Sequence, residues 1–248
     1  MKVAVVGATG RIGRETAAAL EKSGHEVVPI SRSVGVDVQS GEGLAAALEG
    51  VAAVVDASNT PAQDEAEVLA FFGTATQNLL TAEQAAGVGH HVLLSIVGID
   101  HGQDVPHYAG KRRQEQLVRE GAVPFSIVRA TQFHDFAAMV AGWAEQDGTA
   151  TIAPLLVQPI APGDVGEILA EVAAGAPANG VQEIAGPETH DLVDLARRTY
   201  AARGQEIRLV PTWRGIFDTS MAGEVLLPGP DARLGRTTVD AWLAAGAH

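Results

Sequence analysis

The chain of 248 residues contains no cysteine, few aromatic residues (4%) and no long hydrophobic run. The lack of cysteine excludes a disulfide framework. Hydrophobic residues make up 46% of the sequence, but they are spread in short runs, none long enough to cross a bilayer. The N-terminus enters a strand-like run directly, without the basic region and apolar core of a secretion signal. We therefore expect a cytoplasmic protein with no membrane partner.

Basic residues are also scarce, with 17 Lys and Arg against 30 Asp and Glu, and the formal net charge is −13. This balance disfavours nonspecific binding to nucleic acid, so we expect no nucleic-acid partner. His90 and His91 are neighbours in a strand-like run, where adjacent side chains face opposite ways, and no other ligand cluster has convincing spacing. We predict no metal site. The absence of a Gly-x-Ser-x-Gly turn argues against a serine hydrolase.

Short apolar runs of strand character alternate with Ala-, Leu- and Glu-rich segments of helical character. The predicted strands are residues 3–6, 26–30, 53–57, 91–96 and 125–129, and the predicted helices are residues 11–22, 43–48, 64–86, 107–120 and 132–146. Such alternation is typical of a parallel sheet wound with helices. The sequence therefore predicts an α/β fold with a doubly wound parallel sheet of the Rossmann type.

The pattern is less regular after Gly148, where prolines separate shorter elements. We expect a helix of the main body at residues 163–174, short strands at 181–184 and 207–210, and helices at 191–203 and 237–245. The predicted organisation is a Rossmann domain over residues 1–150 and a small C-terminal substrate lobe over residues 151–248. We expect the two to pack as a single structural unit, with some later elements returning to the main sheet.

A glycine-rich segment, Gly7-Ala8-Thr9-Gly10-Arg11-Ile12-Gly13, follows the first predicted strand and opens the first predicted helix. A sharp turn from strand to helix beside a phosphate needs residues that tolerate unusual backbone angles and lack side chains, and glycine meets both demands. The N-terminus of the helix adds unpaired N–H groups and a positive dipole end. The segment therefore predicts a dinucleotide site. Its predicted residues are Gly7, Thr9, Gly10, Arg11, Ile12 and Gly13.

The second predicted strand is followed by Ser31, Arg32 and Ser33. Folds of this type contact the adenosine ribose here, and an acidic residue at this place selects NAD. The acid is absent from this chain, and Arg32 between two hydroxyl groups suits a ribose 2′-phosphate. The predicted cofactor is NADP(H), with NAD(H) as the alternative.

Four segments together carry a resemblance to a known family. They are the glycine-rich segment, Leu94-Ser95-Ile96-Val97-Gly98, residues 107–117 and Val128-Arg129-Ala130-Thr131-Gln132-Phe133. The chain resembles the short-chain dehydrogenase/reductase superfamily, specifically its atypical, NmrA-like NAD(P)H-binding members, over most of its length. The resemblance implies that a Ser or Thr at the end of the fourth strand and a Tyr-x-x-x-Lys pair on the next helix perform the reaction.

The predicted catalytic residues are Ser95, His107, Tyr108 and Lys111. Reduction of a carbonyl by hydride needs a proton donor at the oxygen, and a tyrosine near a lysine serves well because the lysine lowers the phenol's pKa. The residue four places before Lys111 is His107, however, and Tyr108 lies three places before it. Three outcomes stay open: histidine replaces tyrosine as donor, Tyr108 swings in, or ordinary carbonyl reductase chemistry is lost.

The resemblance implies roles for further residues. It places Asp37 and Val38 by the adenine, Ala57, Ser58 and Asn59 in a cofactor loop, Ser95 and Lys111 with the cofactor, Ala130 and Thr131 at the nicotinamide carboxamide, and Val97, Phe133 and His134 beside the substrate. In contrast, Arg112, Arg113 and Glu115 are expected to form a solvated helix face.

The function expected from these features is that of an NADP(H)-dependent oxidoreductase acting on a small or medium organic carbonyl, quinone or enone. Two alternatives stay open, because fold alone does not choose among them. One is a non-enzymatic dinucleotide sensor that binds a protein partner, and the other is a non-redox epimerase, cyclase or dehydratase. The expected partners are a small-molecule substrate and a second copy of the chain in a homodimer, the commonest soluble oligomer.

Overall fold

The computed structural model describes residues 1–101 and 105–246, which form two compact units. The first unit comprises Met1–Arg129 and Pro162–Gln182, and the second comprises Ala130–Ala161 and Glu183–His248. The units therefore interleave along the chain and do not follow a single boundary at residue 150. The expected division into domains of residues 1–150 and 151–248 stays a prediction.

Seven strands form the main sheet. They are β1 (Lys2–Val6), β2 (Glu26–Ile30), β3 (Ala53–Asp56), β4 (His90–Ile96), β5 (Phe125–Ala130), β9 (Gly180–Ala185) and β12 (Arg233–Leu234). Their order is β12-β9-β5-β4-β3-β1-β2, and β1 pairs in parallel with both β2 and β3. The first five coincide with the predicted strands to within one residue at either end, which confirms the predicted doubly wound α/β fold.

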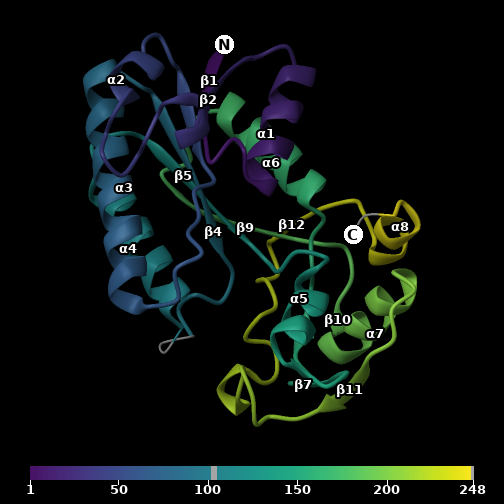
Figure 1. The fold of residues 1–248 in the computed structure, drawn as a ribbon. Coiled ribbons are helices and arrows are strands. Elements are labelled where there is room, and N and C mark those ends of the chain that lie inside the picture. The colour runs from purple at the N-terminus through teal and green to yellow at the C-terminus, as the bar shows by residue number, and fades with distance from the viewer. Residues whose placement is uncertain (102–104, 247–248) are drawn as a thin grey trace. The chain divides into compact units, whose positions relative to one another are not determined.

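Helices cover both faces of the sheet in the first unit (Figure 1). One face carries α1 (Arg11–Lys22) and α6 (Pro162–Ala174), and the other carries α2 (Leu44–Ala47), α3 (Glu65–Ala86) and α4 (Pro106–Glu120). A Cβ atom on Gly166 of α6 would lie 2.7 Å from the Cβ of Glu15 on α1. This close packing explains why α6 belongs to the first unit although it follows residue 150 in the sequence.

The core of the first unit lies on both sides of β1, whose successive side chains point to opposite faces of the sheet. All of Val3, Ala4, Val5 and Val6 are buried, because both faces of the sheet are covered. Ala4 and Val6 belong to a core cluster with residues of α2, α3 and α4. The continuous apolar run that predicted β1 is therefore the signature of a strand buried on both faces.

The second unit contains smaller elements. They are α5 (Phe136–Trp143), α7 (Leu192–Ala202), α8 (Val239–Ala244), β6 (Glu145–Gln146), β7 (Thr149–Ile152), β8 (Leu156–Val157), β10 (His190–Asp191), β11 (Arg208–Pro211) and the 3-10 turn η2 (Thr219–Met221). A three-stranded sheet has the order β11-β7-β6, and β10 pairs with β8. Asp191 caps α7 by accepting a hydrogen bond from the backbone N–H of Asp194.

The predicted helix at residues 132–146 is wrong at both ends, because α5 spans Phe136–Trp143. Phe133 instead forms a parallel bridge with Ile160, and the Gln132 carbonyl accepts a hydrogen bond of 2.8 Å from the Ile160 N–H. This pairing holds the backbone before the helix extended. At the other end, Glu145 and Gln146 pair with β7. Pairing with residues distant in sequence outweighs local helix propensity here.

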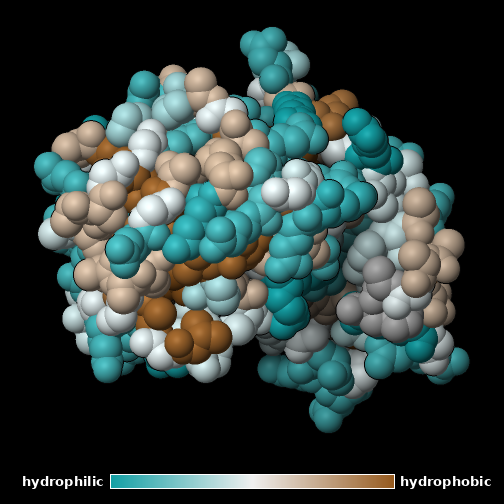
Figure 2. All heavy atoms as spheres, turned by 90° about the horizontal axis from the view of Figure 1, so that it is seen from above, coloured by the Kyte–Doolittle hydropathy of each residue, from teal (hydrophilic) through white to brown (hydrophobic). Residues whose placement is uncertain are grey.

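The acidic excess lies mainly at the surface. Among residues 1–101 and 105–246, the buried Asp, Glu, Lys and Arg side chains are Asp56, Glu83, Lys111 and Glu115. Hydrophilic residues are spread over the face seen in Figure 2, with hydrophobic areas between them. Within the same described residues, no helix is long and apolar enough to span a bilayer.

One buried charge is paired inside the core of the first unit. The Nδ1 atom of His91 lies 2.9 and 3.0 Å from the carboxylate oxygens of Glu83, and both side chains are fully buried. Burial raises the pKa of Glu83. Burial alone would lower the pKa of His91, but the charge and hydrogen bond of Glu83 outweigh it, so this pKa is raised as well. The pair therefore keeps a proton inside the fold.

Substitution Glu83→Ala should lower the free energy of unfolding by about 3–5 kcal/mol, because it leaves His91 buried without its partner. Urea unfolding measures the loss. The matched control is Glu120→Ala on exposed Glu120, which should change stability by less than about 0.5 kcal/mol. Equal small losses from both variants would contradict the paired arrangement.

The contribution of the His91–Glu83 pair to stability should fall as pH rises from 6.5 to 8. Above the ordinary His value of 6.5, an unfolded chain releases the His91 proton while the fold retains it, because the folded pKa is raised. At this site the folded state then binds more protons, so the pair's contribution to the free energy of unfolding decreases with pH. Urea unfolding at the two pH values isolates this contribution: the change in the free energy of unfolding from pH 6.5 to 8 should be more negative in the original protein than in a double variant with Glu83→Gln and His91→Gln. An equal slope in both proteins would argue against the pair as its source.

Candidate functional site

The glycine-rich segment forms a tight turn between β1 and α1. Gly7 has a φ of +74°, in the left-handed region that favours glycine, and a Cβ there would lie 2.7 Å from the carbonyl oxygen of Ala57. A Cβ on Gly13 would lie 2.1 Å from the carbonyl oxygen of Gly7. The backbone approaches itself so closely that neither position accepts a side chain without movement.

The start of α1 offers donors to an anion. Gly10 is the N-cap residue and has no side chain to cap the helix, so the N–H groups of the first turn, from Arg11 to Gly13, face outward from the helix end. Thr9 and Gly10 are exposed. Backbone N–H groups at a helix N-terminus bind phosphate groups. The tight glycine turn and the helix end without a side-chain cap are together the features that suit a dinucleotide pyrophosphate.

The segment after β2 presents a cation. Arg32 begins the 3-10 turn η1 (Arg32–Val34), and its side chain is exposed. The hydroxyl oxygens of Ser31 and Ser33 lie 2.9 Å apart. Among the residues that the structure describes, none forms a hydrogen bond or ion pair with the Arg32 guanidinium. The two hydroxyls form a polar pair, and Arg32, which lies between them in the sequence, adds an exposed cation to this segment.

The segment of Asp37 and Val38 is fixed by hydrogen bonds to α3. The Asn78 amide donates to the carbonyl oxygens of Val38 (2.9 Å) and Gln39 (2.8 Å), and the Gln39 amide donates to Phe71 (2.8 Å). Asp37 accepts a bond from the Gln39 N–H. The segment is ordered by residues that sequence reasoning did not single out, and its contact with adenine stays a prediction.

The turn after β3 is held by a buried carboxylate. Asp56 accepts hydrogen bonds from the Ser58 N–H (2.9 Å) and from the Gln114 side chain of α4 (2.7 Å). Ala57 is half-buried and its N–H donates to Val6, whereas Asn59 is exposed. The predicted cofactor loop of Ala57, Ser58 and Asn59 is therefore joined both to β1 and to α4.

Lys111 lies inside this arrangement. Its ammonium donates to the carbonyl oxygens of Ser58 (3.4 Å) and Leu94 (3.0 Å) and to the Gln114 side chain (2.9 Å), and it lies 4.7 Å from the centre of the Phe72 ring. Burial lowers the pKa of Lys111 to about 8, against the opposing charges of Asp56 and Glu115. All three N–H donors have internal acceptors, so a ribose ligand would have to replace one of them.

His107 and Tyr108 occupy the first turn of α4. The His107 ring packs edge-on against Phe72 at 5.6 Å, and burial together with the Lys111 charge lowers the pKa of His107 to about 4. Burial raises the pKa of Tyr108, with no lowering by Lys111. At neutral pH both side chains are therefore uncharged. The structure brings both predicted donors onto the helix that carries Lys111, but neither is an activated acid.

Ser95 at the end of β4 belongs to a buried ionic network. Its hydroxyl donates to Glu115 at 2.5 Å, and Arg129 donates to both Glu115 carboxylate oxygens at 2.8 Å. Arg119 also donates to Glu115, and Arg129 reaches Asp100. Burial alone would raise the pKa of Glu115, but these hydrogen bonds and the Arg129 charge lower it. Ser95 keeps only acceptor capacity for any further partner.

The expected solvated face of Arg112, Arg113 and Glu115 is wrong for Glu115, which is 1% exposed. Arg112 donates to the carbonyl oxygen of Ile99, and Arg113 remains exposed. Glu115 lies four residues after buried Lys111, so both occupy the same face of α4. That spacing is the one signal in the sequence that pointed to a buried Glu115.

The residues predicted around the nicotinamide and the substrate fall into both units. Val97 is buried in the first unit. In the second unit, the Thr131 hydroxyl donates to the Gln158 carbonyl at 2.6 Å, and Ala130 is buried. Phe133 is half-buried, and the fully buried His134 ring packs against Trp242 at 5.4 Å. Their contacts with cofactor and substrate stay predictions.

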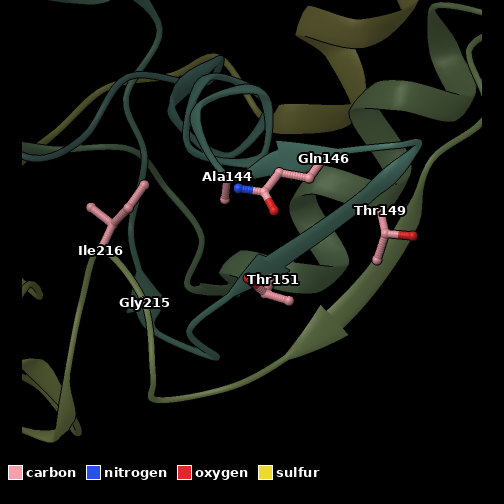
Figure 3. Close-up of a pocket in the computed structure, with 6 residues that line it drawn as sticks. All are labelled: Ala144, Gln146, Thr149, Thr151, Gly215 and Ile216. Atoms are coloured by element: carbon pink, nitrogen blue, oxygen red, sulfur yellow. The ribbon is translucent and has the colours of Figure 1, made fainter.

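A cavity of about 450 Å³ lies in the second unit. None of the predicted site residues lines it. It is lined by Ala144, Gln146, Thr149, Thr151, Gly215 and Ile216 (Figure 3). Strands β6 and β7 supply the polar side chains, and the loop after β11 supplies Gly215 and Ile216. Within residues 1–101 and 105–246, no group of three or more His, Cys, Asp or Glu side chains could hold a metal ion.

Comparisons with known proteins place the sequence in context. Residues 7–174 match a family model described as NAD(P)H-binding. The chain is 30% identical over 147 residues to the photosystem II assembly factor Ycf39 of Synechocystis, covering 54% of this chain and 45% of that protein. It is 32% identical over 145 residues to a (4-alkanoyl-5-oxo-2,5-dihydrofuran-3-yl)methyl phosphate reductase of Streptomyces griseus, covering 53% and 48%. The chain thus spans about half the length of these relatives.

Solved structures share the fold. A short-chain dehydrogenase/reductase superfamily protein from Agrobacterium tumefaciens with bound NAD has a TM-score of 0.73 and 20% identity, over 100% of this chain and 96% of that one. An NADPH-dependent quinone oxidoreductase from Escherichia coli has a TM-score of 0.72 and 16% identity, over 99% and 100%. At these identities the likeness concerns the fold alone.

Substitution Gly13→Ala should destabilise the protein, because the added Cβ meets the Gly7 carbonyl at 2.1 Å. The matched control is Gly73→Ala in α3, where a Cβ has nothing within 4 Å. This control should stabilise the helix by about 0.5–1 kcal/mol. Thermal unfolding should therefore shift down for the first variant and up for the second. Equal upward shifts would contradict the close approach at Gly13.

Proposed function

We propose, from the premise that this chain belongs to the NAD(P)H-binding family, that it is an NADP(H)-dependent oxidoreductase. The family match agrees with the resemblance to the atypical, NmrA-like short-chain dehydrogenase/reductases that the sequence motifs carry. The proposed substrate is a small or medium organic carbonyl, quinone or enone. A reductase and a quinone oxidoreductase among the similar proteins support this proposal.

The observation that carries the proposal is the turn from Gly7 to Gly13. Gly7 and Gly13 allow close approaches of the backbone that a Cβ would block, and the start of α1 has no side-chain cap, so its backbone donors remain for a ligand at the turn. These features hold a pyrophosphate by backbone contacts. In this proposal the bound nicotinamide supplies a hydride, and the chain binds the cofactor and orients it.

The preference for NADP(H) is supported by the segment after β2. An exposed, unpaired Arg32 beside the hydroxyls of Ser31 and Ser33 provides the charge and the donors that a 2′-phosphate needs. The ribose of NAD carries a hydroxyl at this position, which gains less from a guanidinium. We propose Asp37 and Val38 at the adenine, and Ala57, Ser58 and Asn59 along the cofactor.

One observation favours a second candidate function, that of a dinucleotide sensor without catalysis. The Ser95 hydroxyl donates its hydrogen bond to Glu115, and the Lys111 ammonium donates hydrogen bonds to three acceptors within the protein. The similarity to a photosystem II assembly factor supports this alternative, because that name describes assembly rather than reduction. A sensor would bind the cofactor and a protein partner without oxidising NADPH.

The remaining expectations accompany the proposal. We propose a small-molecule substrate bordered by Val97, Phe133 and His134, with Ala130 and Thr131 at the carboxamide. A homodimer and a cytoplasmic location are proposed on general grounds alone.

The test is NADPH consumption followed at the nicotinamide absorbance, with calorimetric binding of NADPH measured on the same preparation. The oxidoreductase predicts tight binding and oxidation with at least one acceptor from a panel of ketones, enones and quinones. Tight binding without oxidation by any acceptor would favour the sensor. Absence of binding would contradict both candidate functions.

Substitution Arg32→Ala should weaken NADPH binding roughly 10- to 100-fold, because charge-assisted hydrogen bonds contribute about 1.5–3 kcal/mol each. Binding of NADH should change little, since it lacks the 2′-phosphate. The matched control is Arg113→Ala, which removes an exposed arginine bonded to Gln116. Titration calorimetry with both nucleotides measures the four affinities. Equal losses for NADPH and NADH would contradict the assignment of Arg32.

A further inference from the structure

We propose that the substrates of this oxidoreductase are quinones and similar conjugated acceptors, whose reduced form is a stabilised anion, rather than simple ketones. This inference rests on the proposed function and names its substrate class. It follows from the internal partners of the four residues that the sequence offers as proton donors and orienting groups, Ser95, His107, Tyr108 and Lys111.

Ser95 has no proton to offer a substrate oxygen. Its hydroxyl donates to Glu115 at 2.5 Å, and Arg129 fixes that carboxylate through two further bonds of 2.8 Å. The bond to a buried anion is strong and short. A carbonyl oxygen approaching Ser95 would meet lone pairs in place of a donor.

Lys111 is held in the same way. Its ammonium has acceptors on β4, on the turn after β3 and on its own helix, at Leu94, Ser58 and Gln114. These bonds join the ends of two strands to α4, so the side chain acts within the fold. If the ammonium turned to donate a hydrogen bond to a substrate, one of the three buried acceptors would lose its bond to Lys111. The cost of that loss disfavours the change of partner.

The two remaining candidates are weak acids. His107 packs against Phe72, and its low pKa keeps the ring neutral at physiological pH. Burial raises the pKa of Tyr108, so its phenol is a weaker acid than an ordinary tyrosine. The efficiency of general acid catalysis depends on an acid poised near the working pH. Neither side chain meets that condition.

The missing donor matters differently for the two classes of acceptor. Hydride addition to a simple ketone gives an alkoxide about as basic as hydroxide, whose parent water has a pKa of about 16. A quinone takes the hydride and its two electrons to become a hydroquinone anion, a phenolate with a conjugate acid near the tyrosine value of about 10. NADPH becomes NADP⁺, and water then protonates the phenolate. The second reaction proceeds without a donor from the protein.

The kinetic test compares methyl-1,4-benzoquinone with cyclohexane-1,4-dione, a saturated ring with the same two carbonyl groups. After subtraction of the uncatalysed rate, kcat/KM for the quinone should exceed that for the dione at least about 100-fold, the lower range of a general acid's contribution. Quinones are intrinsically more reactive, so isotope effects decide. Deuterium at the transferred position of NADPH should slow quinone reduction, and D2O should not.

A second readout does not depend on activity. The free energy of unfolding is measured for Ser95→Ala, Glu115→Gln and the double variant. If Ser95 donates to Glu115, the two losses are coupled and the double variant loses less than their sum. Additive losses would overturn the premise that Glu115 holds the Ser95 proton.

The outcomes separate this inference from the proposed function. A D2O effect on quinone reduction, or a kcat/KM for the dione within about 100-fold of that for the quinone, overturns the inference and leaves the oxidoreductase intact. Tight NADPH binding with no acceptor reduced overturns both.

Discussion

Burial of opposite charges on one face of α4 is the constraint around which the first unit is organised. Lys111 and Glu115, one helical turn apart, are 5% and 1% exposed. A buried charge is tolerated only when it is paired and hydrogen-bonded. Lys111 therefore joins the ends of β3 and β4 through Ser58 and Leu94, and Glu115 joins β4 to β5 through Ser95 and Arg129. The edge of the sheet at which ligands of such folds bind is fixed by these two side chains.

The hydrogen bonds of Ser95 and Lys111 within this network differ from those that the family resemblance implies. In the family that the sequence resembles, a serine and a lysine at these places are expected to act on substrate and cofactor. Here their polar atoms are directed to internal partners, while the glycine turn keeps the features of a nucleotide site. The proposed function requires cofactor binding. The proposed preference for quinones dispenses with a proton donor from the protein.

Local signals predicted most of the fold. The strands buried on both faces are apolar throughout, and α1 follows its glycine turn, so both were readable from the sequence. The pairing of Phe133 with Ile160 and the two-residue strands of the second unit depend on contacts distant in the chain. At the candidate site, the glycine turn was predictable because it depends on residues adjacent in the sequence, whereas the binding role of Arg32 stays a prediction. The partners of Ser95 were not, because Glu115 and Arg129 meet only after α4 packs on the sheet.

A crystal structure of the protein grown with NADPH would test the central claim most directly. We expect the pyrophosphate against the first-turn N–H groups of α1 and the 2′-phosphate within hydrogen-bond distance of Arg32, with the Ser95–Glu115 hydrogen bond retained. Electron density for the dinucleotide elsewhere, or for Ser95 turned from Glu115 toward the nicotinamide, would contradict it.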